Sequence, residues 1–148
     1  MPLGELIGAN HVIVDLRVAD KAQLLQELAR RAGAALSLDQ RIILDALQAR
    51  ENLGSTGLGK GFALPHARLD GLSRFFALFV RLAKPIDFAS IDGLPVDLVI
   101  LLLTPANASN QHLATLAALS RPLRDATFVQ RLRKAPDADA LHRLLANA

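Results

Sequence analysis

Hydrophobic and polar residues repeat with two different periods along this chain. Residues 11–18 carry Val12, Val14 and Leu16 at every second position, which predicts a short strand. The segments that follow change to apolar residues spaced three and four apart, which predicts amphipathic helices. Both periods therefore occur close together in one chain, as expected for a fold of mixed class.

Two helices are predicted by capping residues with an apolar stripe behind each. Asp20 stands at an N-cap position, and Gly33 supplies the expected end of that helix. Ser37 and Gln40 form a capping-box pattern for a second helix, which should end near Glu51. The stripes consist of Leu24, Leu25 and Leu28 in the first helix and of Leu38, Ile42, Ile43, Ala46 and Leu47 in the second.

Two later segments have the composition of strands. Residues 75–82 and 94–104 are both strongly apolar, and the second is almost continuously so. A strand with hydrophobic side chains at successive positions is covered on both faces. Residues 94–104 are therefore predicted to form the central strand.

Helices are predicted for the last third of the chain. Asn107 or Ser109 is expected to cap a helix that ends at Pro122, while Asp125 and Asp137 are expected to begin two further short helices. Several helices flanking a layer of strands predict a three-layer α/β sandwich. No repeat or linker divides the chain, so we expect one domain over residues 1–148.

Composition and charge narrow the range of functions. Of the 148 residues, 51% are apolar, which is enough for a sizeable core. The net charge is +3, and the sequence contains no long basic run of the kind that binds nucleic acid. The absence of cysteine excludes disulfides, thiolate metal sites and a cysteine nucleophile. Neither a signal-peptide pattern nor an apolar run of about 18 residues occurs, so we expect a cytoplasmic protein without membrane insertion.

The segment RENLGSTGLGKGFALPH, residues 50–66, carries the most distinctive chemistry. Its glycines allow the backbone to turn amides toward an anion, which suggests a phosphate. A nucleotide-binding P-loop would need Ser or Thr after Gly59 and Lys60, but Gly61 stands there. A P-loop also joins a strand to a helix, whereas a helix is predicted before this segment. Nucleotide binding is therefore disfavoured.

A phosphate that becomes attached to the protein fits this segment better. His66 follows Pro65, which restricts the backbone, and the hydroxyls of Ser55 and Thr56 precede it in the same segment. A neutral imidazole is a competent nucleophile near pH 7, and Arg50 could contact phosphate oxygens as a bidentate cation. The pattern predicts a histidine phosphoryl carrier.

The same segment also resembles a known family. ARENLGSTGLGKGFALPHARLDGL, residues 49–72, resembles the signature of the fructose and mannitol type of enzyme IIA of the bacterial phosphoenolpyruvate phosphotransferase system. The stretches PIDFASIDGLPVDLVILLLTP and QHLATLAALSRPLRD resemble later segments of that family, so the likeness extends from about Leu16 to the C-terminus. The chain is most similar to the nitrogen-regulatory variant, a free-standing domain of this length without a sugar permease.

The resemblance implies a fold, a mechanism and partners. The family's fold is a mixed β-sheet flanked by helices, and its members take phosphate from an HPr-like phosphocarrier without a cofactor or metal ion. The phosphate then either regulates a downstream target protein, which we favour, or passes to a IIB domain of a sugar permease. The implied site consists of His66 as the phosphorylated residue, His112 as the second active-site histidine, Arg50 of the Arg-Glu step, and Ser55, Thr56 and Gly57 in the phosphate-binding loop.

Each of these residues also has a simpler interpretation. His66 could be a turn histidine bound by the backbone, and His112 a polar residue in the first turn of its helix. Arg50 could interact only with the dipole of the helix that it ends, and Lys60 is expected to be solvated. A group of basic residues near the C-terminus forms either a solvated helix face or a docking surface for an acidic partner: Arg121, Arg124, Arg131, Arg133 and Lys134.

Overall fold

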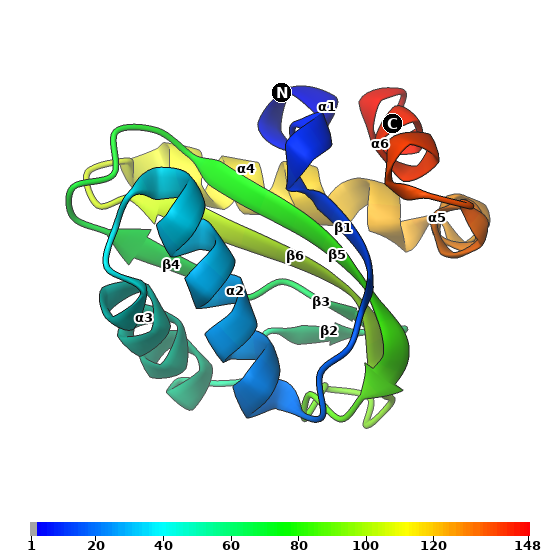
Figure 1. Ribbon diagram of the computed structural model, residues 1–148, viewed down its shortest axis with the longest axis horizontal. Coiled ribbons are helices and arrows are strands. Elements are labelled where there is room, and N and C mark those ends of the chain that lie inside the picture. The colour runs from blue at the N-terminus through cyan, green and yellow to red at the C-terminus, as the bar shows by residue number, and fades with distance from the viewer. Residues whose placement is uncertain (1–2) are drawn as a thin grey trace.

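A six-stranded mixed sheet lies between two layers of helices in the computed structural model, which describes residues 3–148 (Figure 1). The strand order is β1-β5-β6-β3-β2, and β4 also pairs with β6. Strands β5 and β6 are antiparallel, whereas β1 is parallel to β5, and β3 and β4 are parallel to β6. The strands are β1 (Val12–Leu16), β2 (Gly57–Gly59), β3 (Phe62–Ala63), β4 (His66–Leu69), β5 (Phe76–Ile86) and β6 (Val96–Pro105).

The helices divide between the two faces of the sheet, as Figure 1 shows. Helices α2 and α3 cover one face, and α4, α5 and α6 lie on the other with the short α1. The predicted three-layer α/β sandwich is confirmed. The α-helices are α1 (Leu3–Leu6), α2 (Lys21–Leu36), α3 (Gln40–Asn52), α4 (Ser109–Ser120), α5 (Ala126–Lys134) and α6 (Ala138–Ala146), and η1 (Ala9–His11) and η2 (Arg121–Arg124) are 3-10 helices.

Strand β6 is the central strand that its continuous hydrophobicity predicted. Its side chains alternate between two hydrophobic cores, because successive residues of a strand point to opposite faces. Val99 and Leu101 pack with α2 and α3, whereas Leu98 and Ile100 pack with the helices of the opposite face. All four side chains are fully buried.

The capping residues in the sequence predicted most of the helix starts correctly. Asp20 accepts a hydrogen bond from the backbone N–H of Gln23 at the start of α2, and Asp125 and Asp137 cap α5 and α6 in the same way. The prediction for α4 was wrong, since Ala108 occupies its N-cap position without a side-chain bond. Helix α4 ends at Ser120, and η2 then carries the chain through Pro122.

The predicted connection between α2 and α3 was also wrong. Helix α2 continues past Gly33 to Leu36 and is closed by Ser37 in the left-handed conformation, with φ 55°. Asp39, rather than Ser37, caps α3. A Cβ on Gly33 would lie 2.9 Å from the carbonyl oxygen of Leu38, so this glycine permits the close approach of the connection instead of ending the helix.

The glycine-rich segment folds partly into strands that the sequence did not predict. Strands β2 and β3 form a short hairpin, and Lys60 and Gly61 turn the chain between them with φ of 58° and 84°. Pro65 then separates β3 from β4, and its carbonyl oxygen accepts a hydrogen bond from the N–H of Leu102 in β6. The break at Pro65 places His66 at the start of β4, beside the central strand.

The basic residues near the C-terminus do not behave as one solvated face. Arg133 is half-buried, pairs with Asp97 at 2.8 Å and donates to the carbonyl oxygen of Lys60. It therefore fastens α5 to the β2–β3 hairpin. The other four members are exposed: Arg121, Arg124, Arg131 and Lys134.

Candidate functional site

The ring of His66 is held in one tautomer by its surroundings. It is half-buried, and its Nδ1 lies 2.7 Å from the carbonyl oxygen of Leu64. Because a carbonyl only accepts, Nδ1 carries the proton and Nε2 keeps its lone pair. The Nε–H of Arg50 donates to that Nε2 at 3.3 Å. His66 thus presents a basic nitrogen with a fixed cation directly beside it.

The environment of His66 favours its neutral form. Burial lowers the pKa of His66, and the positive charge of Arg50 lowers it further. The hydrogen bond to the carbonyl of Leu64 and the negative charge of Glu51 raise the pKa, but the net shift is downward. The imidazole is therefore neutral at pH 7, which is the state that a nucleophilic nitrogen requires.

His112 approaches His66 from α4. The centroids of the two rings are 5.6 Å apart, with an angle of 51° between their planes. Only 7% of His112 is exposed, and its Nδ1 lies 2.9 Å from the hydroxyl oxygen of the fully buried Thr104 in β6. Burial lowers the pKa of His112, and the nearby positive charges of Arg68 and Arg50 lower it further.

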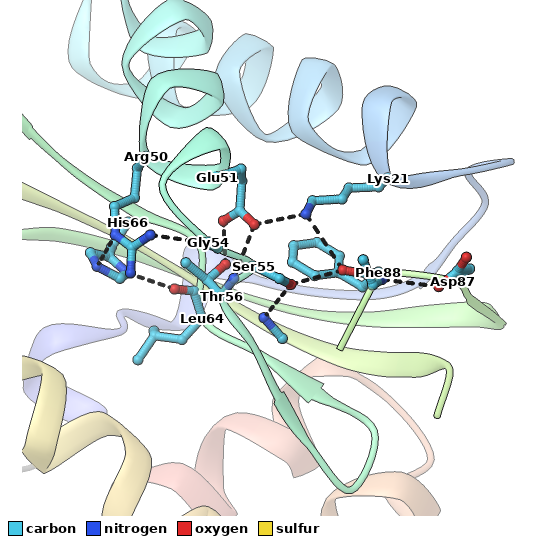
Figure 2. Close-up of polar contacts among 12 residues, drawn as sticks. Lys21, Arg50, Glu51, Gly54, Ser55, Thr56, Leu64, His66, Asp87 and Phe88 are labelled. Atoms are coloured by element: carbon cyan, nitrogen blue, oxygen red, sulfur yellow. Dashed lines mark hydrogen bonds and ion pairs between the residues drawn. The ribbon is translucent and has the colours of Figure 1, made fainter. Parts of the chain in front are cut away.

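Arg50 completes the cluster from the last turn of α3. Its Nη1 donates to the carbonyl oxygen of Gly54 at 2.9 Å while its Nε contacts His66, as Figure 2 shows. Three elements from different parts of the chain, α3, β4 and α4, therefore bring Arg50, His66 and His112 together. A pocket of about 230 Å³ adjoins Arg50 and His66; it is lined by Arg50, Ser55, Thr56, Leu58, Leu64, His66, Leu116, Ala117 and Ser120.

The predicted phosphate-binding loop lies beside this cluster, but its polar groups are occupied. The hydroxyl of Ser55 donates to the carbonyl oxygen of Phe88 at 2.9 Å and accepts from the N–H of Gly57 at 3.0 Å. Thr56 is 2% exposed, and both its N–H and its hydroxyl donate to the carboxylate of Glu51 (Figure 2). Ser55 and Thr56 line the pocket and Gly57 does not, and phosphate binding by all three stays a prediction.

Three residues of the site were missed in the sequence. Arg68 follows His66 by two residues in β4, so both side chains lie on the same face of that strand. The alternation of side chains along a strand would have indicated this, had β4 been predicted. Thr104 ends an apolar run that predicts only a strand, although a lone hydroxyl in such a run needs a partner. Glu51 entered the sequence analysis only as part of the Arg-Glu step, and its role was not apparent there because its partners Lys21 and Thr56 meet it only in the folded chain.

Two further features of the described chain bear on its class. Within residues 3–148, the histidine and acidic side chains form no cluster of three that could hold a metal ion. In the same part of the chain, the helices are all too short or too polar to cross a membrane.

Comparison with known proteins agrees with the fold. The family model described as "Phosphoenolpyruvate-dependent sugar phosphotransferase system, EIIA 2" matches residues 5–148. A nitrogen regulatory protein of Bradyrhizobium diazoefficiens is 44% identical over 146 residues, which cover 99% of this chain and 95% of the relative. A protein of the same name from Pseudomonas aeruginosa is 36% identical, with coverage of 97% and 94%.

Solved structures of known proteins also share the fold of this chain. The crystal structure of the nitrogen regulatory protein IIA-Ntr from Neisseria meningitidis superimposes with a TM-score of 0.91 at 34% identity and covers 96% of this chain and 97% of that one. The mannitol IIA of Escherichia coli shares the fold, with a TM-score of 0.80 at 22% identity and coverage of 94% and 98%.

The fold and these matches define the class of the protein as a phosphotransfer component of the phosphoenolpyruvate-dependent phosphotransferase system. Within that system, the chain belongs to the enzyme IIA family of type 2.

Proposed function

We propose that the protein is a phosphohistidine carrier, which accepts a phosphoryl group on Nε2 of His66 from an HPr-like phosphocarrier. The observation that supports this most directly is the tautomer of His66. Its Nδ1 proton is bound to the carbonyl of Leu64, so Nε2 is unprotonated, and its lone pair accepts the hydrogen bond from the Nε–H of Arg50. A nucleophile and a cation for the developing negative charge are thus already in contact.

The transfer follows from these positions. The lone pair of His66 Nε2 attacks the phosphorus of the donor's phosphohistidine in line, and the donor's P–N bond breaks with its electron pair returning to the donor ring. Nδ1 of His66 keeps its proton, and the hydrogen bond to Leu64 stabilises the ring as it gains positive charge. The guanidinium of Arg50 moves from Nε2 to the phosphoryl oxygens, where it forms charge-assisted hydrogen bonds.

His112 and Arg68 have supporting roles in this proposal. If the hydroxyl of Thr104 donates to Nδ1 of His112, then Nε2 of His112 carries a proton that it can donate to a phosphoryl oxygen. Arg68 lies close enough to lower the pKa of His112, so it adds a second positive charge near the same group. Positioning and charge stabilisation together carry the catalysis.

We further propose that phosphorylation serves regulation, since the most similar relatives described above are named nitrogen regulatory proteins. A sugar-transport role is the second candidate. A fructose-specific EIIA component of Haloferax volcanii is 36% identical over 124 residues, and one structural neighbour is a complex of mannitol IIA with phosphorylated IIB. Both roles share the same first phosphoryl transfer.

Labelling by a phosphorylated HPr-like carrier tests the first step. We expect the wild-type protein to gain the mass of one phosphoryl group and His66→Ala to gain none. His142→Ala is a control, because His142 hydrogen-bonds to the carbonyl oxygen of Ile7 and belongs to α6, which packs against β1 at the other edge of the sheet from β4. Undiminished, acid-labile labelling of His66→Ala would refute the assignment. Affinity capture with wild type, His66→Ala and His66→Asp then separates the two roles, and recovery of a IIB domain would favour sugar transport.

A further inference from the structure

The carboxylate of Glu51 is the centre of a polar network behind the site. Its side chain is only 6% exposed, and its Oε1 lies 2.8 Å from Nζ of Lys21 and 3.0 Å from the N of Thr56. Its Oε2 accepts from the hydroxyl of Thr56. A carboxylate this far from water is stable only when such partners surround it, so the three contacts hold one another in place.

This network connects four separate segments of the chain. Lys21 is the first residue of α2, Glu51 lies in the last turn of α3, and Thr56 belongs to the loop before β2. Lys21 also contacts the buried Phe88, which follows β5: its Nζ lies 4.4 Å from the centre of the ring and 3.4 Å from the carbonyl oxygen. Ser55 donates to the same carbonyl, as Figure 2 shows.

The network also bears on Arg50, the neighbour of Glu51 in α3. Arg50 uses Nη1 to hold the carbonyl of Gly54 and Nε to contact His66. The loop between α3 and β2 is therefore held at Gly54 by Arg50 and at Thr56 by Glu51. Gly54 itself has a φ of 148° and nothing within 4 Å of where a Cβ would stand, so packing does not fix the loop at this residue.

We infer that Glu51 is a positioning residue. By binding Thr56 and Lys21, it fixes the loop to which Arg50 is hydrogen-bonded, and it thereby keeps the guanidinium beside Nε2 of His66. This inference rests on the proposed phosphoryl transfer. Glu51 touches neither the phosphoryl group nor His66 in this arrangement; its charge raises the pKa of His66, and its contacts act on the site through Arg50. Its loss should therefore slow the transfer step without weakening the binding of the donor.

Two isosteric variants test the inference. Glu51→Gln removes the charge, and Thr56→Val removes the hydroxyl donor, while each keeps the shape of the side chain. We expect each to lower the maximal rate of transfer from the phosphorylated HPr-like carrier about tenfold and to change KM less than about twofold. Thr56→Ser keeps the hydroxyl and should recover most of the lost rate.

Glu27→Gln is the matched control. Glu27 is also a carboxylate with several cationic partners, since it binds Arg30 and Arg31, but both partners lie on its own helix α2 and none belongs to the loop before β2. We expect this variant to transfer at the wild-type rate. The N–H of Arg50 gives a second readout by NMR: its Nε–H signal should exchange slowly with water in the wild type and in Glu27→Gln, and faster in Glu51→Gln.

The outcomes separate the inference from the proposed function. If Glu51→Gln unfolds at a lower temperature but transfers at the wild-type rate when folded, Glu51 has a purely structural role and the inference is wrong. A higher KM with an unchanged maximal rate would also overturn it. If the wild-type protein is not labelled on His66 at all, the proposed function itself fails.

Discussion

The imidazole rings of His66 and His112 face one another across a centroid distance of 5.6 Å, although one comes from strand β4 and the other from helix α4. The pairing depends on β6, which lies beside β4 and also supplies Thr104 as the partner of His112. His66 opposes Leu102 in that register, and Arg68 opposes Thr104. The strand register thus brings the two histidines and a second arginine to one place.

Replacement of Arg50 by lysine should reduce phosphoryl transfer strongly. Arg50 contacts His66 through Nε and Gly54 through Nη1, and a single ammonium group cannot reproduce both contacts. We expect Arg50→Lys to lower the transfer rate by about tenfold to a hundredfold, measured by single-turnover labelling from the phosphorylated donor. Lys60→Met is the control, because the Lys60 side chain is exposed; an equal loss in both variants would contradict a specific role for Arg50.

Removal of the Thr104 hydroxyl should affect both stability and transfer. Thr104→Val keeps the shape of this fully buried side chain but leaves Nδ1 of His112 without its partner. We expect a loss of about 1–2 kcal/mol in the free energy of unfolding, measured in urea, because an unsatisfied polar group remains in the interior. The transfer rate should fall about tenfold as the His112 tautomer is no longer fixed.

Thr104→Ser provides the comparison for that variant. It retains the hydroxyl, so the ¹⁵N shifts of the His112 ring should stay close to those of the wild type, whereas Thr104→Val should change them. Identical ring shifts in all three proteins would show that Thr104 does not determine the tautomer.

Much of the fold followed from local sequence patterns, because those patterns have local causes. The N-caps at Asp20, Asp125 and Asp137 each depend on a carboxylate and an amide two or three residues away, so they could be predicted without knowledge of the fold. Strand β6 was predictable because burial on both faces leaves a continuous apolar run.

The missed features depend on contacts between distant segments. Strands β3 and β4 are two and four residues long, which is too short for an alternation of apolar and polar residues to appear. They form by pairing with β6. Gly33 is an exception of shorter range, since a glycine commonly ends a helix, but here the close approach of the α2–α3 connection at Leu38 determines its role. Motifs pointed to Arg50, His66 and His112 as candidates, but only the structure shows that the three side chains lie together.

Gly57 offers a test of why a glycine is needed beside the site. A Cβ there would overlap the hydroxyl of Ser90 and lie 2.9 Å from its Cα, so the close approach of the loop after β5 excludes a side chain. We expect Gly57→Ala to lower the free energy of unfolding by about 1–3 kcal/mol. Gly8→Ala is the control, because its Cβ would meet only His11 at 4.0 Å.

The double variant Gly57→Ala with Ser90→Gly distinguishes packing from phosphate binding. Removal of the serine side chain relieves part of the overlap, so some of the lost stability should return. If Gly57→Ala is as stable as the wild type, steric exclusion is not the reason for this glycine.

The pH dependence of stability should reflect three histidines. Burial lowers the pKa of His11, His66 and His112 in the folded protein, while in the unfolded chain each titrates near its usual value of about 6.5. Between the lowered native pKa and the unfolded pKa, the unfolded chain binds more protons than the folded one. The free energy of unfolding therefore rises with pH across that interval. The contribution of the three histidines to stability is fully present above the interval and is lost as the pH falls through about 6.5 toward the lowered native pKa values.

Urea unfolding at about pH 7.5 and about pH 5.5 measures this loss, and His66→Gln and His112→Gln should each make it smaller. The transfer rate should depend on pH in the same direction, since only neutral His66 has a free lone pair on Nε2. Because the pKa of His66 is lowered, the rate should be flat around pH 7 and fall only at more acidic values. A rate that declined as the pH rose through that lowered pKa would mean that protonated His66 is the reactive form, which is incompatible with attack by Nε2.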